Sequence, residues 1–363
     1  MTYDSNSGSK SAKPRKKRSH SVTLRTVADH VKLSPATISI VLNRSPVAKS
    51  IPAETQERIF KAAKELNYRP NYLARSLRNQ RSMSVGVLVP EVIGGYAVGV
   101  LSGLEEQLQQ SEYFYLIASH GSRPNLLKKY VSLLQDRLVE GFILIATSIE
   151  APLDLPTVSV AGHKELEGVT NVVIDHHTAI HSAMSHLVEL GHRDIAFFKG
   201  HPGSSDTEDR WQAVQDAATD LGIVIHPELS PQLSGGAGKI FTPQQGYEEG
   251  YAFGRQLLDA GRTFTALMAF NDVSAIGAMR AFLDAGFNIP DDISVIGFDD
   301  IESAAFHNPG LTTIRQPLAD MGRIAGKTLL DHLSRHGEPK DLVPFIHVDP
   351  QLIVRGTTAA RRS

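Results

Sequence analysis

The sequence contains no cysteine and only one tryptophan among its 363 residues. Without cysteine the chain cannot form disulfide bonds, use a thiolate in catalysis or bind a metal through thiolate ligands. No apolar run approaches the roughly 20 residues that a membrane-spanning helix needs, and the first residues lack the apolar segment of a secretory signal. We therefore expect a cytoplasmic protein without membrane contact, and its 41% hydrophobic content is sufficient for buried cores.

The net charge of −2 conceals two regions of opposite sign. Residues 1–81 contain 17 Lys and Arg against 5 Asp and Glu, whereas the remaining residues contain 20 against 34. A basic head on an acidic body predicts that the head binds a polyanion such as nucleic acid, and that salt weakens this attraction.

Residues 1–21 are rich in Ser, Lys and Arg and have almost nothing to bury. Such a composition predicts a disordered basic tail. Two interpretations stay open, a solubilising leader and an arm that contacts phosphates.

The segment after this tail predicts two short helices joined by a tight turn. Thr23 and Ser34 are residue types that cap helix N-termini, and Pro35 suits a first helical turn, where its missing N–H costs nothing. The first helix repeats apolar residues at helical spacing, on a face formed by Leu24, Val27, Ala28 and Val31.

The second helix packs on this face in the predicted arrangement, through Ile38, Val41 and Leu42. Its outward face is small and largely polar, and consists of Ala36, Thr37, Ser39, Ile40 and Asn43. Such a face beside basic residues is typical of a helix-turn-helix motif that enters the DNA major groove. An ordinary helical hairpin has the same periodicity, so the pattern alone leaves both open.

A third helix is predicted from Pro52 to Leu66, which completes a helical DNA-binding domain over residues 22–70. The next segment, residues 71–82, is predicted to be a hinge helix and linker. Its helical part is too short to be stable alone in water, so we expect it to order only when docked.

From Ser84 onward, short apolar strands alternate with helical patterns as far as Asp299. This rhythm predicts the α/β class, with parallel sheets covered by helices. Its length predicts two similar lobes within an effector-binding and dimerisation domain over residues 83–356, followed by a C-terminal tail over residues 357–363. Ligands of such sheets bind at the carboxyl ends of the strands, here in the cleft between the lobes.

Several motifs in head, hinge and body carry a resemblance to a known family. They include Leu33–Thr37, Tyr68–Asn71, Phe270–Asp272 and Val295–Asp300. In these motifs, their order and their separations, the chain resembles the lactose-repressor (LacI/GalR) family of transcriptional regulators. The resemblance implies a small all-α helix-turn-helix head and a hinge helix, then a two-lobed body of parallel sheets like periplasmic sugar-binding proteins.

The resemblance also implies which residues contact DNA. Pro35 and Ala36 match the main specificity positions of the family, and Ala74 and Leu77 match the hinge residues that enter the minor groove. An apolar wedge there unstacks a base step and kinks the duplex, although simple packing at the hinge stays an alternative for Leu77. The complete set expected at DNA is Leu24, Ser34, Pro35, Ala36, Thr37, Ser39, Ile40, Asn43, Tyr68, Asn71, Ala74 and Leu77.

Two departures from the family pattern affect the DNA site. Most members have Arg where this chain has Ile40. Arg can form bidentate hydrogen bonds with guanine, whereas Ile can only touch a thymine methyl or exclude a base, so we expect a different operator at that step. The chain is also longer by Ala48–Ser50 than the commonest spacing, which could reposition a backbone contact to phosphate.

The resemblance places Arg210 and Asp272 where the family grips a small polar effector. A carboxylate accepts paired hydroxyl or amine groups, and a guanidinium donates a planar fork. The alternatives are a helix N-cap for Asp272 and a surface ion pair for Arg210. Further candidates are Tyr96, in the loop after the first strand, and Asp175, His163 and Gln316. On family grounds we expect a sugar or related metabolite.

The resemblance implies a homodimer, sometimes paired into a tetramer, on a pseudo-palindromic double-stranded operator at the bacterial nucleoid. No heptad pattern follows Arg355, which favours the dimer. Effector binding would change the angle between the lobes and so order or melt the hinges, and inducer and co-repressor both stay open.

Other functional classes receive less support. An activator would use the same architecture, and a sugar-binding transport protein would share the body but not the basic head. No catalytic constellation or cofactor motif stands out, so we expect neither an enzyme nor a cofactor. His177 and His181 have the spacing of metal ligands on a helix, but the missing third ligand disfavours a metal site there.

Overall fold

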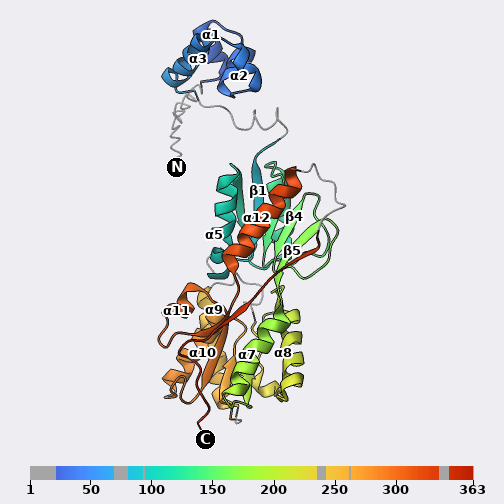
Figure 1. Cartoon of the computed structure of the whole chain (residues 1–363), viewed down its shortest axis with the longest axis vertical. Helices are drawn as coiled ribbons and strands as arrows, with labels where there is room; N and C mark the ends of the chain where they lie inside the picture. Colours follow the sequence, from blue (N-terminus) through green and yellow to red (C-terminus); the bar gives the residue numbers. More distant parts are fainter. Residues whose placement is uncertain are drawn as a thin grey trace, which may run out of the picture. The chain divides into compact units, whose positions relative to one another are not determined.

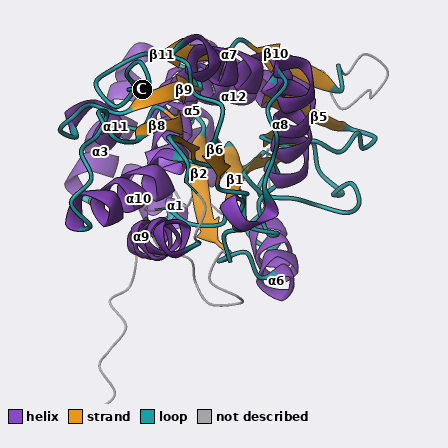
Figure 2. Ribbon diagram, turned by 90° about the horizontal axis from the view of Figure 1, so that it is seen from below, coloured by secondary structure: helices purple, strands orange, loops and turns teal. Residues whose placement is uncertain are grey.

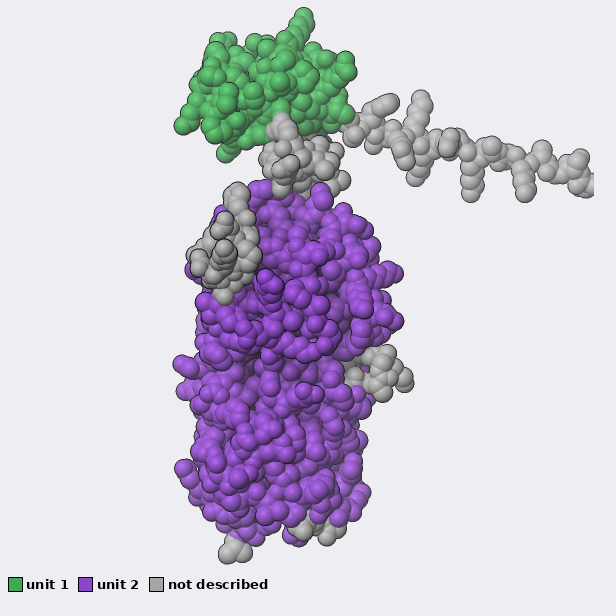
Figure 3. Space-filling model, turned by 90° about the vertical axis from the view of Figure 1, so that its right-hand side faces the viewer, with its two compact units in different colours: residues 1–80 green, residues 81–363 purple. Residues whose placement is uncertain are grey.

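The computed structural model describes residues 22–68, 81–92, 95–234, 243–260, 263–334 and 343–362. The chain divides into two compact units, residues 1–80 and 81–363 (Figure 3). The predicted basic tail and hinge helix lie outside the described residues, as do Asn71, Ala74 and Leu77. Among the described helices, none combines the length and the apolar character that crossing a membrane requires.

The first unit, here called the head, is entirely helical in its described part. Its elements are α1 (Leu24–Val31), α2 (Pro35–Leu42), the short 3₁₀ helix η1 (Pro46–Ser50) and α3 (Ala53–Glu65). The predicted apolar face is confirmed, because Val27, Ile38 and Ile59 are fully buried where the three α-helices meet.

Local hydrogen bonds set the ends of these helices as the sequence predicts. Thr23 Oγ1 accepts from the backbone N–H of Thr26 at 3.3 Å, and Ser34 Oγ accepts from that of Thr37 at 3.1 Å. Between them Lys32 adopts the left-handed conformation, with φ of 57°, which ends α1 and turns the chain into α2.

The second unit, here called the body, contains two sheets with helices outside them (Figures 1 and 2). The sheet of the first lobe is parallel throughout, in the order β10-β5-β4-β3-β1-β2. Its strands are β1 (Ser84–Val89), β2 (Phe114–Ser119), β3 (Phe142–Ile145), β4 (Thr157–Val160), β5 (Val169–Ile174) and β10 (Phe345–Val348). The helices on it are α5 (Gly95–Gln110), α6 (Pro124–Gln135) and α12 (Leu318–Ser334).

The sheet of the second lobe has the order β11-β9-β8-β7-β6. Its strands are β6 (Ile195–Phe197), β7 (Ala266–Met268), β8 (Ser294–Asp299), β9 (Thr312–Arg315) and β11 (Gln351–Ile353). Among the described strands, only β11 departs from the predicted parallel arrangement, since it pairs antiparallel with β9. The helices are α7 (His176–Glu189), α8 (Thr207–Leu221), η2 (Pro227–Leu229), α9 (Pro243–Asp259), α10 (Asp272–Asp284) and α11 (Glu302–Phe306).

The two predicted lobes are confirmed, but they are not successive halves of the chain. Among the described elements the chain passes from one lobe to the other between β5 and α7, between β9 and α12, and between β10 and β11. The helix α12 therefore returns to the first lobe, where it lies beside α5 (Figure 1). Gly103 of α5 and Gly322 of α12 make this approach possible, because a Cβ on either would overlap the backbone of the other helix.

Alternating apolar residues along the strands form the core. Val85, Val87 and Val89 of β1 belong to the core under α5 and α12, whereas Leu88 packs on the opposite face with Leu134 of α6. All four β1 residues are fully buried, as expected of a central parallel strand with helices on both faces.

The predicted separate tail over residues 357–363 is corrected by the structure. Thr357 is fully buried, and its hydroxyl accepts from the N–H of Thr312 and donates to the carbonyl of Val295. Ala359 also accepts a hydrogen bond from His192, at 3.0 Å. Thr357 and Ala359 therefore belong to the second lobe. Their hydrogen bonds satisfy polar groups beside its sheet, which are buried away from water.

Candidate functional sites in the head and in the body

The exposed surface of α2 begins with the predicted contact residues. Ser34, Pro35 and Ala36 are exposed, and Thr37 and Ile40 are half-buried. Leu24 and Tyr68 pack partly against the head core, so they contribute to its stability as well as to its surface.

Ser39 does not face outward as predicted, because it is only 8% exposed. The side chain of Asn43, one turn later, donates hydrogen bonds to the carbonyl of Ser39 at 2.7 Å and to its hydroxyl at 3.1 Å. Asn43 itself is half-buried. The accessible part of α2 is therefore its N-terminal end together with Ile40.

The head also presents cations. Arg25, Lys32, Arg44 and Lys49 are exposed, and no ion pair joins any of them to an acid in the described part of the chain. Exposed Lys and Arg side chains of this kind can neutralise phosphates, which supplies affinity that does not depend on sequence.

In the body, a cavity of about 120 Å³ is lined by both lobes. Its walls come largely from the segments that follow strands, at the carboxyl ends of the sheets. The polar residues among them include Glu91 after β1, Asn271 after β7 and Asp299 at the end of β8. Tyr96 of α5 and Arg210 of α8 also line it.

Arg210 is a buried cation, not a member of a surface ion pair. Its side chain is 5% exposed, and its Nη1 donates to the carbonyl of Phe270 at 2.6 Å. Its Nη2 lies 3.0 Å from Oδ2 of Asp206. The guanidinium also lies 3.7 Å from the ring centroid of Phe298. These contacts hold the guanidinium in one orientation at the cavity wall.

Two acids of the cavity have strongly perturbed pKa values. Burial raises the pKa of Glu91 to about 7, and Oε2 of this residue has no hydrogen-bond partner among the described residues. Burial also raises the pKa of Asp299 to about 7, although Arg210 and the side chain of Gln316 oppose the shift. Near neutral pH both acids can therefore donate or accept a hydrogen bond.

The predicted effector residues fall into different positions. Tyr96 and Arg210 line the cavity, and Tyr96 lies in the first turn of α5 instead of a loop. The Tyr96 hydroxyl is buried without a hydrogen-bond partner among the described residues. Gln316 lies behind the wall, where its Nε2 donates to Oδ1 of Asp299 at 2.7 Å.

Asp272 and Asp175 do not line the cavity, so the structure corrects both expectations. Asp272 is fully buried and accepts from the N–H of Ile301 at 2.9 Å and from the Thr313 hydroxyl at 2.5 Å. Burial and the negative charge of Asp299 raise its pKa well above the ordinary value. The N-cap of α10 is Asn271. Asp175 is an exposed N-cap of α7, and it accepts from the N–H of Thr178 at 3.1 Å.

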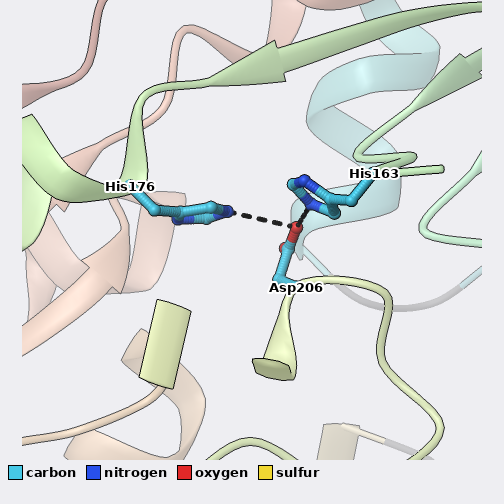
Figure 4. Close-up of side chains that lie close together, drawn as sticks. All are labelled: His163, His176 and Asp206. Carbon is cyan, nitrogen blue, oxygen red and sulfur yellow. Dashed lines mark hydrogen bonds and ion pairs between the residues drawn. The ribbon is translucent and has the colours of Figure 1, made fainter. Parts of the chain in front are cut away.

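His163 lies beside the cavity, in the loop after β4, and contacts two acids of the second lobe. Its Nε2 is 2.6 Å from Oδ1 of Asp206 and its Nδ1 is 2.8 Å from Oδ2 of Asp209. Burial lowers the pKa of His163, but the two carboxylates outweigh burial and the net shift is upward. His176, at the first turn of α7, also points at Asp206 (Figure 4).

Sequence reasoning missed Glu91, Asp299 and Asp206. Asp299 ends a predicted strand, so its place at a carboxyl end was a usable signal. Glu91 follows the first strand in the same way. Asp206 had no such signal, because it does not directly follow a strand. Its partners are His163, which is distant in sequence, and Arg210 of α8.

Comparisons with known proteins agree with this geometry. The family model for bacterial regulatory proteins of the lacI family matches residues 23–71, and the model for a periplasmic binding protein-like domain matches residues 184–358. The chain therefore carries a helix-turn-helix domain of the lacI type and a periplasmic binding protein-like domain.

Relatives that match this chain over nearly their whole length are named as transcriptional regulators. The HTH-type transcriptional repressor PurR of Haemophilus influenzae is 29% identical over 92% of this chain and 97% of its own. The ribose operon repressor of Halalkalibacterium halodurans is 28% identical over 93% of this chain and 97% of its own. The lac repressor dimer, bound to operator and the anti-inducer ONPF, has a TM-score of 0.77 at 25% identity, over 93% of this chain and 99% of its own.

Proposed function

We propose that this protein is a sequence-specific DNA-binding transcriptional repressor whose affinity for its operator is controlled by a small polar effector in the body cavity. The observation that carries the proposal is the combination of two sites in one chain. The head presents the N-terminal end of α2 and exposed Lys and Arg side chains that form no ion pair with a described acid, and the body encloses a cavity at the carboxyl ends of its strands. The relatives named as repressors favour repression over activation.

On the DNA side, the proposed contacts are the exposed end of α2, with Pro35 and Ala36 as the main readers. Ile40 would contact a thymine methyl or exclude a base at its step. In the hinge, Asn71, Ala74 and Leu77 remain proposals from the family resemblance. A homodimer would place one head on each half of a pseudo-palindromic operator, within the bacterial nucleoid.

On the effector side, the cavity fits a small ligand rich in hydroxyl or similar polar groups. Arg210 would donate its remaining guanidinium protons, and Glu91 and Asp299 would pair with hydroxyls in either protonation state. The Tyr96 ring supplies a face for apolar contact. A sugar or related metabolite has this chemistry.

Because the cavity is lined by both lobes, its ligand can favour one angle between them. A change in that angle would move the chain segments that connect the lobes. The predicted hinge helix, which precedes Arg81, would respond by ordering or melting. Such a ligand acts only by its difference in affinity between the two states, so either an inducer or a co-repressor fits the same geometry.

The first experiment selects genomic DNA fragments bound by the purified full chain, with and without a panel of sugars and related metabolites. We expect one palindromic site, and a change in its occupancy with one class of metabolite. The variant Ile40→Arg should shift the preferred base towards guanine at one step of each half-site, whereas the exposed control Lys61→Ala on α3 should keep the wild-type site. Fragments without a common site, in every condition, would contradict the proposal.

A further inference from the structure

A cluster of three side chains beside the cavity is not explained by effector binding. Two imidazoles, of His163 and His176, face one carboxylate, of Asp206 (Figure 4). One ligand atom from each residue can be chosen so that all three lie within 4.8 Å of one another. The two imidazole rings are 5.3 Å apart between centroids, so the space between them is small and polar.

His176 is the member of this cluster whose polar atoms are buried without being satisfied by the protein. The residue is 5% exposed, and no described residue forms a well-aligned hydrogen bond with either of its ring nitrogens, although Nε2 makes an ion-pair contact with Asp206. Its Nε2 is directed at Oδ1 of Asp206 but stays 3.4 Å from it. A buried polar group without a partner costs stability, so the arrangement suits a ligand that would sit between the two atoms.

The distances fit a metal ion. A tetrahedral Zn²⁺ lies about 2.1 Å from each imidazole nitrogen or carboxylate oxygen, which separates two ligand atoms by about 3.4 Å. The His176–Asp206 distance of 3.4 Å already has this value. The His163–Asp206 distance of 2.6 Å is that of a hydrogen bond, so the ion would replace the shared proton and the pair would widen by about 0.8 Å.

The surroundings also have the features of a metal site. His163 directs its other nitrogen, Nδ1, to Asp209 Oδ2 at 2.8 Å. A carboxylate behind a ligating imidazole fixes the ring and increases its basicity. Asp206 uses Oδ1 towards the histidines, while its Oδ2 is held by Arg210 at 3.0 Å. The positive charge of Arg210 opposes a cation, but Asp206 and Asp209 carry two negative charges between them.

We propose that His163, His176 and Asp206 bind a divalent transition-metal ion, with Zn²⁺ as the ion that best suits two imidazoles and one carboxylate. Three protein ligands leave a fourth position for water. His163 belongs to the first lobe, whereas His176, the first residue of α7, and Asp206 belong to the second lobe. A bound ion would therefore join the two lobes beside the effector cavity.

The test uses the full chain, freed of metal by a chelator and titrated with Zn²⁺ in competition with a chromophoric chelator. We expect one ion per chain. His163→Gln and His176→Gln should each weaken binding by about 100-fold or more, and Asp209→Asn by about 10-fold, since it acts through His163. The control His181→Gln removes an exposed histidine of α7 that is not part of the proposed site. This variant should bind Zn²⁺ like the wild type.

The wild type alone gives a second measurement, which does not depend on how well a variant folds. Co²⁺ added to the metal-free chain should produce the intense visible absorption of a four-coordinate ion, and Zn²⁺ should abolish it. No saturable Zn²⁺ binding by the wild type would overturn the proposal, as would wild-type affinity in a folded His163→Gln or loss of the ion in His181→Gln. None of these measurements involves DNA or effector, so their failure would leave the proposed repressor function intact.

Discussion

The head and the body differ in how widely their functional residues are separated in sequence. In the head, the surface of α2 is set by neighbours: Ser34 caps the helix, Pro35 starts it and Asn43 ends it. In the body, Glu91 and Asp299 line one cavity although most of the domain separates them in sequence. A site made by local hydrogen bonds can be found from a short motif, whereas a site made by strand order requires the whole sheet to form.

The largest test of this contrast removes the buried cation of the body. Arg210→Ala leaves Asp206 buried without its guanidinium partner, so we expect the free energy of unfolding to fall by about 3–5 kcal/mol. Arg280→Ala is the matched control, because Arg280 pairs with Asp284 at 2.8 Å but its side chain is 71% exposed. That change should cost less than about 1 kcal/mol. Urea unfolding measures both, and equal costs would show that burial does not distinguish the two pairs.

A second test removes the centre of the head. Ile38 is fully buried, and Ile38→Ala should destabilise the head by about 2–5 kcal/mol through lost burial and the cavity that remains. We expect loss of operator binding, with the unfolding transition of the body unchanged. Val47→Ala, at a position 60% exposed, is the control and should bind operator normally. If Ile38→Ala also shifted the body transition, the two units would not be energetically separate.

A smaller effect should come from the cap of α2. Ser34→Ala removes the acceptor for the Thr37 N–H, which should cost about 1 kcal/mol and lower operator affinity in proportion. Ser45 precedes η1 without any side-chain capping bond, so Ser45→Ala should have almost no effect. Thermal unfolding and DNA titration of both variants decide this, and an equal response would remove the local explanation of the head.

A further prediction concerns the pH dependence of the body's stability. The pKa of Glu91 is raised by burial from 4.5 to about 7, so the folded state holds its proton more tightly than the unfolded state. The stability that this proton supplies is complete below pH 4.5 and is lost as pH rises through 7. Glu91→Gln should therefore reduce the loss of stability between pH 4.5 and 7. Part of the loss should remain, because the pKa of Asp299 is also raised to about 7. Glu112→Gln, at an exposed position, should retain the wild-type profile, and urea unfolding across pH compares the two.

The sequence predicts the head almost completely. The helices α1, α2 and α3, their caps Thr23 and Ser34, and the buried face around Ile38 follow from residues within a few positions of one another. Two features of the head were not predicted. The 3₁₀ helix η1 is one, and the burial of Ser39 is the other, because it depends on how the side chain of Asn43 folds back over the helix. The strand and helix rhythm of the body up to Asp299 is local in the same sense.

Tertiary structure alone decided how the lobes and the cavity are assembled. The return of α12 to the first lobe, the burial of Thr357 and the removal of Asp272 from the cavity all depend on which strands become neighbours. The same is true of the meeting of His163, His176 and Asp206. The sequence by itself determined elements and caps, because those energies are local. The pairing of distant carboxylates and imidazoles depended on the packed fold, because burial and strand order bring their charges together.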